Sequence, residues 1–321
     1  MQGVFFIVGP TAVGKSAMAA EVAEQLDAEI VNADAFQIYR GLDVLTGKPE
    51  ARTQQRAPHH LLGSVPLSEA MSAAKFRVAG LGTLAGIRSR GKNAIVVGGS
   101  GLYVKGLTDG FDDVPPPDPV LRAQLNELSL AQLVCQLQET NPELAARVDL
   151  RNRRRVMRAL EIGSSGKNRP SREWNGVAAA GIGSGEISAV ETGAATRAAR
   201  PQSEGGVLLI RDRDDLCGRI NDRVYAMFRA DVEEEVRALT EIGSTAAHAL
   251  GLRQLQRFIA GEIPRDECIA QIQQATRRYA KRQLTWFRHQ SNFPQLNLTP
   301  FAHQEAVSAI LQMAQRHLAR E

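Results

Sequence analysis

Residues 4–16 read VFFIVGPTAVGKS, an apolar run that leads into a glycine-rich segment. Val4–Val8 combines β-branched and aromatic residues, which predicts a strand buried on both faces. The next eight residues fit the spacing GxxxxGK[ST], and a helical pattern extends from about Lys15 to Leu26. A glycine-rich loop between a buried strand and a helix is typical of the phosphate-binding P-loop. The chain therefore begins with a βα unit of a parallel sheet.

The loop predicts a site for a polyphosphate. Its glycines let backbone N–H groups surround an anion, and the N-terminus of the following helix adds partial positive charge. Lys15 would neutralise the terminal phosphates, and the Ser16 hydroxyl would be the ligand of Mg²⁺, the expected cofactor. The expected phosphate-binding residues are Gly9, Pro10, Thr11, Ala12, Val13, Gly14, Lys15 and Ser16. Kinases, NTPases and prenyltransferases share this loop, so it leaves the polyphosphate unspecified.

Further strands are predicted at Glu29–Asn32, Ala94–Val97 and Val207–Ile210, with helical stretches between them. This alternation favours βαβ units, so we expect an α/β fold with a P-loop NTPase-like parallel sheet flanked by helices. The two longest helices are expected at Asp215–Leu239 and Asp266–His289.

The composition changes at the proline-rich residues 115–119, which predict an extended linker. Leucines at helical spacing follow and predict a helical insertion domain, whereas the Gly, Ala and Ser residues beyond it predict a flexible loop. The expected domains are a discontinuous P-loop catalytic core at 1–114 and 205–300, a helical insertion at 115–175, a flexible loop at 176–204 and a C-terminal helix at 301–321.

The overall composition is that of a soluble globular protein, with 321 residues of which 43% are hydrophobic and 23% charged. The apolar runs are far shorter than the roughly 20 residues of a membrane span. No secretory signal is recognisable. We therefore expect no membrane association, a cytoplasmic location and a monomer. Three widely spaced cysteines argue against a disulfide framework or a zinc site.

Positive charge is clustered, although the formal net charge is only +4. Residues 151–158 contain five arginines, and residues 268–304 contain five Lys or Arg but no Asp or Glu. Two such clusters beside a phosphate-binding motif indicate a polyanionic partner, although a solvated helix face would give the same pattern.

Asp34 directly follows the second predicted strand. In a parallel sheet the carboxyl ends of the strands face the ligand crevice, so this carboxylate would face the P-loop. There it could hold magnesium or accept a proton. Because Asp is equally favoured as a helix N-cap, the residues alone leave both roles open.

Several blocks, in order, resemble the tRNA dimethylallyltransferases, also called tRNA isopentenyltransferases. The absence of a C-terminal Cys/His zinc finger makes the bacterial form the closer match. The blocks are GPTAVGKS at 9–16, DAFQIYRGLD at 34–43, TGKP at 46–49, APHHL at 57–61, SAAKFR at 72–77, VGGSGLY at 97–103, DP at 118–119, RRVMRALE at 154–161, RINDRVYAM at 219–227 and ATRRYAKRQLTWFR at 275–288. The resemblance covers the chain except for 176–206.

The resemblance implies transfer of a dimethylallyl group from its diphosphate to N6 of the adenosine 3′-adjacent to the anticodon in tRNA, with release of diphosphate. The P-loop would then bind the diphosphate. Three catalytic residues carry over. Asp34 matches the general base for the N6 proton, Arg223 matches a diphosphate-binding arginine, and Ser100 stands where the family usually has Thr.

The resemblance also makes the tRNA anticodon stem-loop the expected partner, and residues 34–37 would surround the target base. An extruded base can stack on aromatic or guanidinium surfaces, yet the residues alone favour helix core for Trp286 and Phe287. The expected tRNA-binding residues are Asp34, Ala35, Phe36, Gln37, Ser100, Arg122, Arg154, Arg155, Arg158, Gly251, Arg253, Gln254, Lys281, Arg282, Gln283, Trp286 and Arg288.

The chain departs from the family pattern at a few positions. The family usually has Ser at Ala35, Ala at Gly47, Tyr at Leu252 and a Gly-Leu pair at residues 230–231. None of these departures removes a phosphate ligand or the expected base.

Three other functions share part of this pattern. A small-molecule kinase would have the P-loop and sheet, but no role for KRQLTWFR or DAFQIYRG. An adenylate isopentenyltransferase acting on free AMP or ATP would have the same site, but the basic clusters favour a polymeric acceptor. A non-enzymatic nucleic-acid-binding module would leave Ser16 and Asp34 unexplained.

Overall fold

A computed structural model describes residues 3–111, 118–164 and 205–319. The described residues form two compact units. One unit comprises the described parts of Met1–Thr108 and Ser188–Glu321, and the other the described part of Asp109–Ile187. The predicted flexible loop at 176–204 and the prolines at 115–117 lie outside the described residues.

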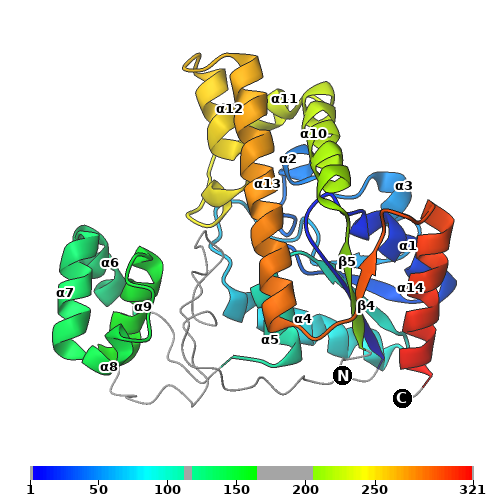
Figure 1. Ribbon diagram of the computed structural model, residues 1–321, viewed down its shortest axis with the longest axis horizontal. Coiled ribbons are helices and arrows are strands. Elements are labelled where there is room, and N and C mark those ends of the chain that lie inside the picture. The colour runs from blue at the N-terminus through cyan, green and yellow to red at the C-terminus, as the bar shows by residue number, and fades with distance from the viewer. Residues whose placement is uncertain (1–2, 112–117, 165–204, 320–321) are drawn as a thin grey trace. The chain divides into compact units, whose positions relative to one another are not determined.

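The larger unit is built on a parallel sheet, as the sequence predicts. Among the described residues the strand order is β3-β2-β4-β1-β5-β6 (Figure 1). The strands are β1 Val4–Val8, β2 Glu29–Asn32, β3 His59–His60, β4 Ala94–Gly98, β5 Gly206–Ile210 and β6 Gln295–Asn297. β1 lies between β4 and β5, and its residues pair with β4 from Val4↔Ala94 to Val8↔Gly98. The loops that follow β1, β2 and β4 therefore emerge at the same edge.

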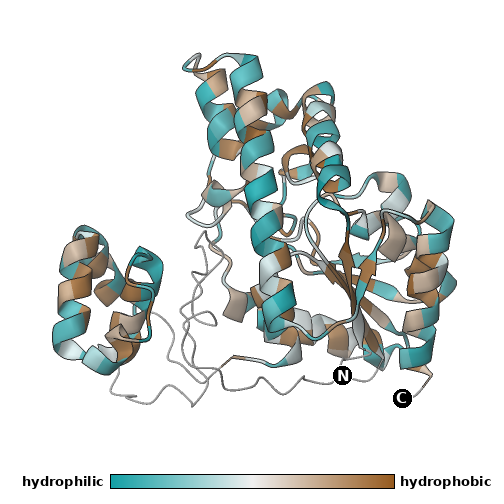
Figure 2. Ribbon diagram, in the orientation of Figure 1, coloured by the Kyte–Doolittle hydropathy of each residue, from teal (hydrophilic) through white to brown (hydrophobic). Residues whose placement is uncertain are grey.

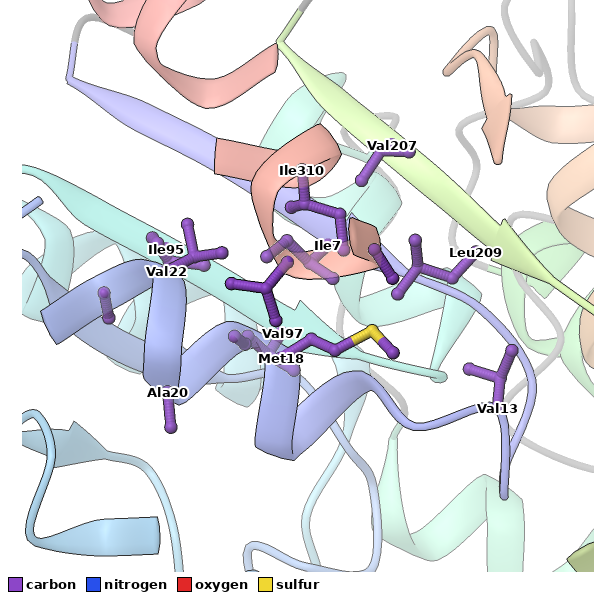
Figure 3. Packing of buried hydrophobic residues seen from close by; sticks show 14 of the residues in the cluster. Ile7, Val13, Met18, Ala20, Val22, Ile95, Val97, Val207, Leu209 and Ile310 are labelled. Atoms are coloured by element: carbon purple, nitrogen blue, oxygen red, sulfur yellow. The ribbon is translucent and has the colours of Figure 1, made fainter. Parts of the chain in front are cut away.

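Helices cover both faces of this sheet. α1 (Lys15–Gln25) and α14 (His303–Leu318) pack on one face, where Ile7, Val97 and Ile310 share one hydrophobic core (Figure 3). α4 (Ala73–Ser89) and α5 (Gly101–Thr108) lie on the opposite face (Figure 1). Because side chains alternate along a strand, one apolar strand serves both layers.

The described part of this unit contains further helices. They are α2 Asp43–Thr46, α3 Ala51–Gln54, α10 Arg213–Arg229, α11 Val232–Arg237, the 3₁₀ turn η1 Ala246–His248, α12 Leu252–Ile259 and α13 Arg265–Gln290. Figure 2 shows α13 as largely hydrophilic along its length, in contrast to the apolar strands. Within the described parts of the chain, none of the helices combines the length and apolar character that crossing a bilayer requires.

One prediction of secondary structure was wrong, and two strands were not predicted. The helix expected at Asp215–Leu239 is broken between α10 and α11, because Asp231 adopts a left-handed backbone with φ of 55°. Asp tolerates that conformation better than most residues. The sequence also gave no sign of β3 or β6. β3 has two residues and β6 one apolar side chain, too few to form a periodic pattern.

The smaller unit is helical, as predicted for the insertion. It contains α6 (Pro119–Glu127), α7 (Leu130–Thr140), α8 (Pro142–Ala145) and α9 (Arg153–Ser164). Local signals set the helix starts. Asp118 caps α6, Ser129 and Gln132 form a capping box on α7, and Asn141 caps α8. The unit has its own core, which includes Leu125, Leu133, Leu137, Val156 and Leu160.

Candidate active site

The loop between β1 and α1 is bent in a way that depends on its glycines. At Gly9, φ is 154°, and a Cβ atom there would lie 2.5 Å from the Leu209 carbonyl oxygen. Gly14, with φ of 107°, is the N-cap residue of α1 and has no side chain to occupy the first amides of the helix. Lys15 donates from Nζ to the Pro10 carbonyl across the loop at 2.7 Å. The result is a helix N-terminus open to an anion.

Side chains from the C-terminal half of the chain hold this loop. Gln283 accepts a hydrogen bond from the Thr11 amide at 2.9 Å. Arg219 Nε donates to the Ala12 carbonyl and Arg211 Nε to the Val13 carbonyl, each at 3.0 Å. The loop sequence alone therefore does not determine its shape.

A cavity of about 390 Å³ opens in front of the loop. It is formed at the carboxyl ends of β1, β2 and β4, with α10 on its far side. The lining residues are Thr11, Ala12, Gly14, Lys15, Ser16, Ala17, Asn32, Asp34, Gln37, Thr46, Gly47, Val97, Gly98, Arg219, Asp222 and Arg223. Most of the expected phosphate-binding residues, Asp34 and Arg223 thus share one cavity.

Three cationic side chains face this cavity. Burial lowers the pKa of Lys15 to about 8, an effect that the carboxylate of Asp34 partly offsets and the charge of Arg223 increases. Burial also lowers the pKa of Arg223 and of Arg219. A bound polyanion would stabilise the charged forms of these side chains.

The Arg223 guanidinium is fixed on two sides. It donates to Thr11 Oγ1 and to the Thr46 carbonyl, each at 2.7 Å. Its Nε is buried and has no hydrogen-bond partner in the described structure. A buried donor without a partner is costly, and in a ligand-binding cavity it is a natural contact for a bound group.

Asp34 caps a turn and also lines the cavity. Its Oδ1 accepts hydrogen bonds from the Phe36 and Gln37 amides at 2.9 and 3.3 Å. Both bonds end on Oδ1, and a carboxylate held in this way keeps Oδ2 as an acceptor. Asp34 is therefore oriented by backbone groups while it faces the P-loop.

Ser100 supports the turn after Asp34 rather than lining the cavity. Its side chain is buried and accepts a hydrogen bond from the Ala35 amide at 2.8 Å. The Tyr279 hydroxyl also bonds to Ser100, and burial, together with the charge of Asp34, raises the pKa of that phenol. The neutral phenol of Tyr279 and the hydroxyl of Ser100 thus support the turn that follows Asp34. Ala35, where the family usually has Ser, is fully buried, so its methyl group packs inside the protein in place of a hydroxyl.

A second cavity of about 30 Å³ shares Thr11, Asp34, Thr46 and Arg223 with the first. Its other walls are mostly apolar. They are Phe36, Leu45, Val224, Met227, Leu250, Ile272, Thr276 and Tyr279. Asp34 and Arg223 therefore have a cationic space on one side and an apolar space on the other.

Two residues that shape this site, Arg219 and Glu235, were not predicted from the sequence. Arg219 precedes Arg223 by four residues, so helical spacing places both on one face of α10, a signal that the RINDR block contained. Glu235 carried no such signal. Its carboxylate accepts from the amides of Asp43, Val44 and Leu45 at 2.7 to 2.9 Å. It thereby anchors α2, whose last carbonyl holds Arg223.

The expected tRNA-binding residues of α12 and α13 differ in exposure. Lys281, Arg288 and Arg253 are exposed. Arg282 lies 5.6 Å above the Tyr279 ring. Gln254 is half-buried, and Gly251, with φ of 94°, is the N-cap of α12. Leu252, where the family usually has Tyr, is 1% exposed and belongs to the core.

Two expected RNA contacts on α13 are engaged inside the protein. Gln283 is buried against the P-loop. Trp286 lies against Gly101 at the start of α5, where a Cβ atom would be 2.2 Å from the indole ring. Phe287 is fully buried and makes an edge contact with Trp286. The prediction that Phe287 belongs to the helix core is therefore confirmed, and Trp286 packs against α5.

Gln37 belongs to the predicted RNA-contact segment at residues 34–37. Its side-chain amide donates hydrogen bonds to the Thr46 and Gly47 carbonyls.

The expected tRNA-binding arginines of the smaller unit are mostly paired within it. Glu161, buried with 2% of its side chain exposed, receives Arg122 at 2.6 and 2.9 Å and Arg158 at 2.9 Å. Arg155 lies 3.6 Å from Asp149. Arg154 is exposed.

Oxygen donors suited to Mg²⁺ line the larger cavity. They are the Ser16 hydroxyl and the carboxylates of Asp34 and Asp222. Hard oxygen ligands of this kind, completed by phosphate oxygens, fit the preferences of magnesium. Over the part of the chain that the structure describes, His, Cys, Asp and Glu form no group of three that could hold a metal by themselves.

Comparisons with known proteins match this chain to one family. The model of the IPP transferase family matches residues 37–290. The chain is 37% identical to a tRNA dimethylallyltransferase of Akkermansia muciniphila, over 92% of this chain and 93% of that one. It is 40% identical to the tRNA dimethylallyltransferase of Rhodospirillum centenum, over 89% and 88%. The crystal structure of the tRNA isopentenylpyrophosphate transferase from Bacillus halodurans superimposes with a TM-score of 0.68 at 28% identity, covering 100% of this chain and 98% of that one. The chain is a member of the IPP transferase family.

Proposed function

We propose that this protein transfers a dimethylallyl group from dimethylallyl diphosphate to N6 of the adenosine 3′-adjacent to the anticodon in tRNA and releases diphosphate. The observation that carries the proposal is the convergence of the P-loop, Arg223 and Asp34 on one cavity. That arrangement offers a diphosphate site and a proton acceptor side by side. The names of the curated relatives agree with it.

The diphosphate would occupy the larger cavity. Lys15, Arg219 and Arg223 supply positive charge there, and the N-terminus of α1 supplies amide donors. As the allylic C–O bond breaks, negative charge grows on the leaving group. Fixed donors in a buried site stabilise that charge more than water does, because they need no reorganisation.

The dimethylallyl chain would lie toward the apolar cavity. The side chains of Leu45, Val224 and Ile272 in its walls are hydrocarbon and offer no nucleophile to an allylic cation. The two cavities share Asp34 and Arg223, so the carbon that reacts would sit near both residues. Such a division keeps the reactive carbon away from solvent and lowers the risk of hydrolysis.

Asp34 would act as the general base. Adenine N6 is a weak nucleophile that gains positive charge on attack, so a carboxylate that removes its proton speeds the step. The two amides that bind Oδ1 fix the orientation of the carboxylate. Ser100 and Tyr279 hold the turn behind it.

Mg²⁺ would be held by the Ser16 hydroxyl, and diphosphate oxygens would complete its coordination. When bound it would supply Lewis-acid stabilisation of the leaving diphosphate.

The tRNA would contact the exposed basic residues of each unit. In the larger unit these include Lys281 and Arg288 on α13 and Arg253 on α12. In the smaller unit Arg154 and Arg122 are the exposed members of the predicted set, and Arg122 is paired with Glu161. The target base would be extruded from its stack to reach Asp34, at a cost of a few kcal/mol. We also propose that the protein is a monomer that acts on tRNA in the cytoplasm.

One experiment separates this function from its rivals. Labelled dimethylallyl diphosphate is offered in parallel with tRNA, AMP and ATP, and transfer of label to each acceptor is measured. We expect label in tRNA alone. Label in AMP or ATP would indicate an adenylate isopentenyltransferase, and tight ATP binding with hydrolysis would indicate a kinase.

A further inference from the structure

Gln283 links two loops of the site through one side chain. Its Oε1 accepts from the Thr11 amide at 2.9 Å, and its Nε2 donates to the Gly99 carbonyl at 2.9 Å. Thr11 belongs to the loop after β1 and Gly99 to the turn after β4. The side chain is only 5% exposed.

This placement distinguishes Gln283 from its neighbours on α13. Lys281 and Arg288 are exposed and can meet an external polyanion, whereas each polar atom of the Gln283 amide has a partner inside the protein. Contact between Gln283 and Gly99 is also close, because a Cβ atom at Gly99 would lie 2.2 Å from Gln283 Nε2. The amide is therefore built into the site rather than presented on a surface.

We propose that Gln283 is a positioning residue that shapes the P-loop for diphosphate. It fixes the backbone of Thr11, whose hydroxyl in turn accepts from Arg223 at 2.7 Å. If Gln283 is lost, the partly buried Thr11 amide loses this acceptor, and the loop is free to change its shape. The loop and Arg223 would then lose their preset geometry together. This inference rests on the proposed function, since it assigns diphosphate to the P-loop.

The test uses Gln283→Met, which keeps the size of the side chain and removes both hydrogen bonds, in the full chain. Binding of inorganic diphosphate with Mg²⁺ is measured by calorimetry, tRNA binding by filter retention, and steady-state constants by label transfer. We expect the Kd for inorganic diphosphate and the KM for dimethylallyl diphosphate to rise about tenfold or more. We expect kcat to fall less than about threefold and the Kd for tRNA to stay within about twofold.

The matched control is Gln274→Met, the same change at an exposed position of α13. It should leave all four constants unchanged. Gln283→Glu is the second variant and covers the case in which the methionine variant does not fold. It keeps an acceptor for the Thr11 amide but loses the donor to Gly99 and adds negative charge beside the loop, so its Kd for inorganic diphosphate should exceed that of the native protein by about tenfold or more.

Different results overturn different statements. If the native protein neither binds inorganic diphosphate nor transfers label, the proposed function is wrong. If the native protein does both and Gln283→Met keeps its diphosphate affinity, only the positioning role is wrong. If Gln283→Met binds tRNA weakly and diphosphate normally, Gln283 is an RNA contact.

Discussion

Basic side chains are concentrated both at the cavity of the larger unit and around α9 of the smaller unit. The positive charge is balanced differently in the two places. Around the cavity, Lys15, Arg219 and Arg223 converge with depressed pKa values. In the smaller unit, Arg122 and Arg158 share the buried carboxylate of Glu161. The cations around the cavity outnumber the carboxylates beside them. In the smaller unit, the carboxylate of Glu161 supplies the negative charge that Arg122 and Arg158 need.

The difference shows that a cluster of arginines in a sequence has no single meaning. Where a buried acidic residue sits among the arginines, part of the cluster holds the fold together. Where cations outnumber carboxylates around a cavity, as Lys15, Arg219 and Arg223 outnumber Asp34 and Asp222, the missing negative charge is expected from a ligand. Four substitutions or titrations test this distinction.

The largest expected effect is at the carboxylate of the cavity. Asp34→Asn should lower single-turnover transfer by about 10²–10⁴, the usual range for loss of a general base, because Asn cannot accept the N6 proton. Binding of tRNA should change by no more than a few-fold. Rapid-quench transfer assays with labelled dimethylallyl diphosphate measure the first quantity and filter binding the second.

Asp222→Asn is the comparison variant for Asp34→Asn, since Asp222 also lines the cavity but is exposed. It should slow transfer much less than Asp34→Asn. Near-normal transfer by Asp34→Asn would remove that residue from the role of base.

The second effect concerns the carboxylate of the smaller unit. Glu161→Gln leaves Arg122 and Arg158 without their shared partner. We expect the free energy of unfolding of this unit to fall by about 2–3 kcal/mol, somewhat less than for a fully buried pair because Arg122 is 44% exposed. Hydrogen exchange of α6 and α9 amides measures the change. Unaltered protection, or weaker diphosphate binding with normal protection, would contradict the structural role.

The third effect is a pH dependence that arises from Lys15. Its pKa of about 8 in the folded protein lies below the ordinary 10.5, so above pH 8 the free enzyme loses the proton that a diphosphate needs. The Kd for inorganic diphosphate should therefore rise up to about tenfold per pH unit between pH 8 and 9.5. Calorimetry across pH 7 to 9.5 measures it.

Deprotonation of Lys15 has opposite effects on diphosphate affinity and on the stability of the fold. Between pH 8 and 10.5 the unfolded chain holds more protons at Lys15 than the folded one, so this group's contribution to stability increases with pH. Lys15→Arg stays charged and should show neither trend. A flat Kd in the native protein across the whole range would mean that Lys15 does not pair with diphosphate.

The smallest effect is on the salt dependence of tRNA binding. Arg154→Gln and Lys281→Gln, both at exposed positions, should each flatten the log–log slope by about 0.7–0.9. Arg158→Gln should change it far less, because Arg158 is 12% exposed and paired with Glu161. Equal changes for Arg154 and Arg158 would show that internal pairing does not withdraw an arginine from RNA.

Much of the larger unit could be predicted because its signals are local. Val4–Val8, Glu29–Asn32 and the P-loop pattern specify strand, loop and helix within one short stretch each. The position of Asp34 at the edge of the sheet follows from strand polarity alone.

The contacts that shape the site could not be predicted, because they are not local. Gln283 and Thr11 are 272 residues apart, and Glu235 and Asp43 are 192 apart. The sequence pattern places Gln283 on a hydrophilic helix and predicts an exposed side chain. Glu161 likewise reads as a surface partner of nearby arginines, although it is buried. Only the packing of distant elements distinguishes these cases.

The position of β1 between β4 and β5 has a consequence for biosynthesis. A nascent chain that has emerged as far as Thr108 contains the P-loop and can pair β1 with β4, but the other edge of β1 stays open until residues 206–210 follow. Arg223 and Gln283 are made later still. Contacts this distant in sequence form slowly and leave strand edges exposed meanwhile. The diphosphate site therefore forms near the end of translation, and a truncated chain with an intact P-loop sequence would lack it.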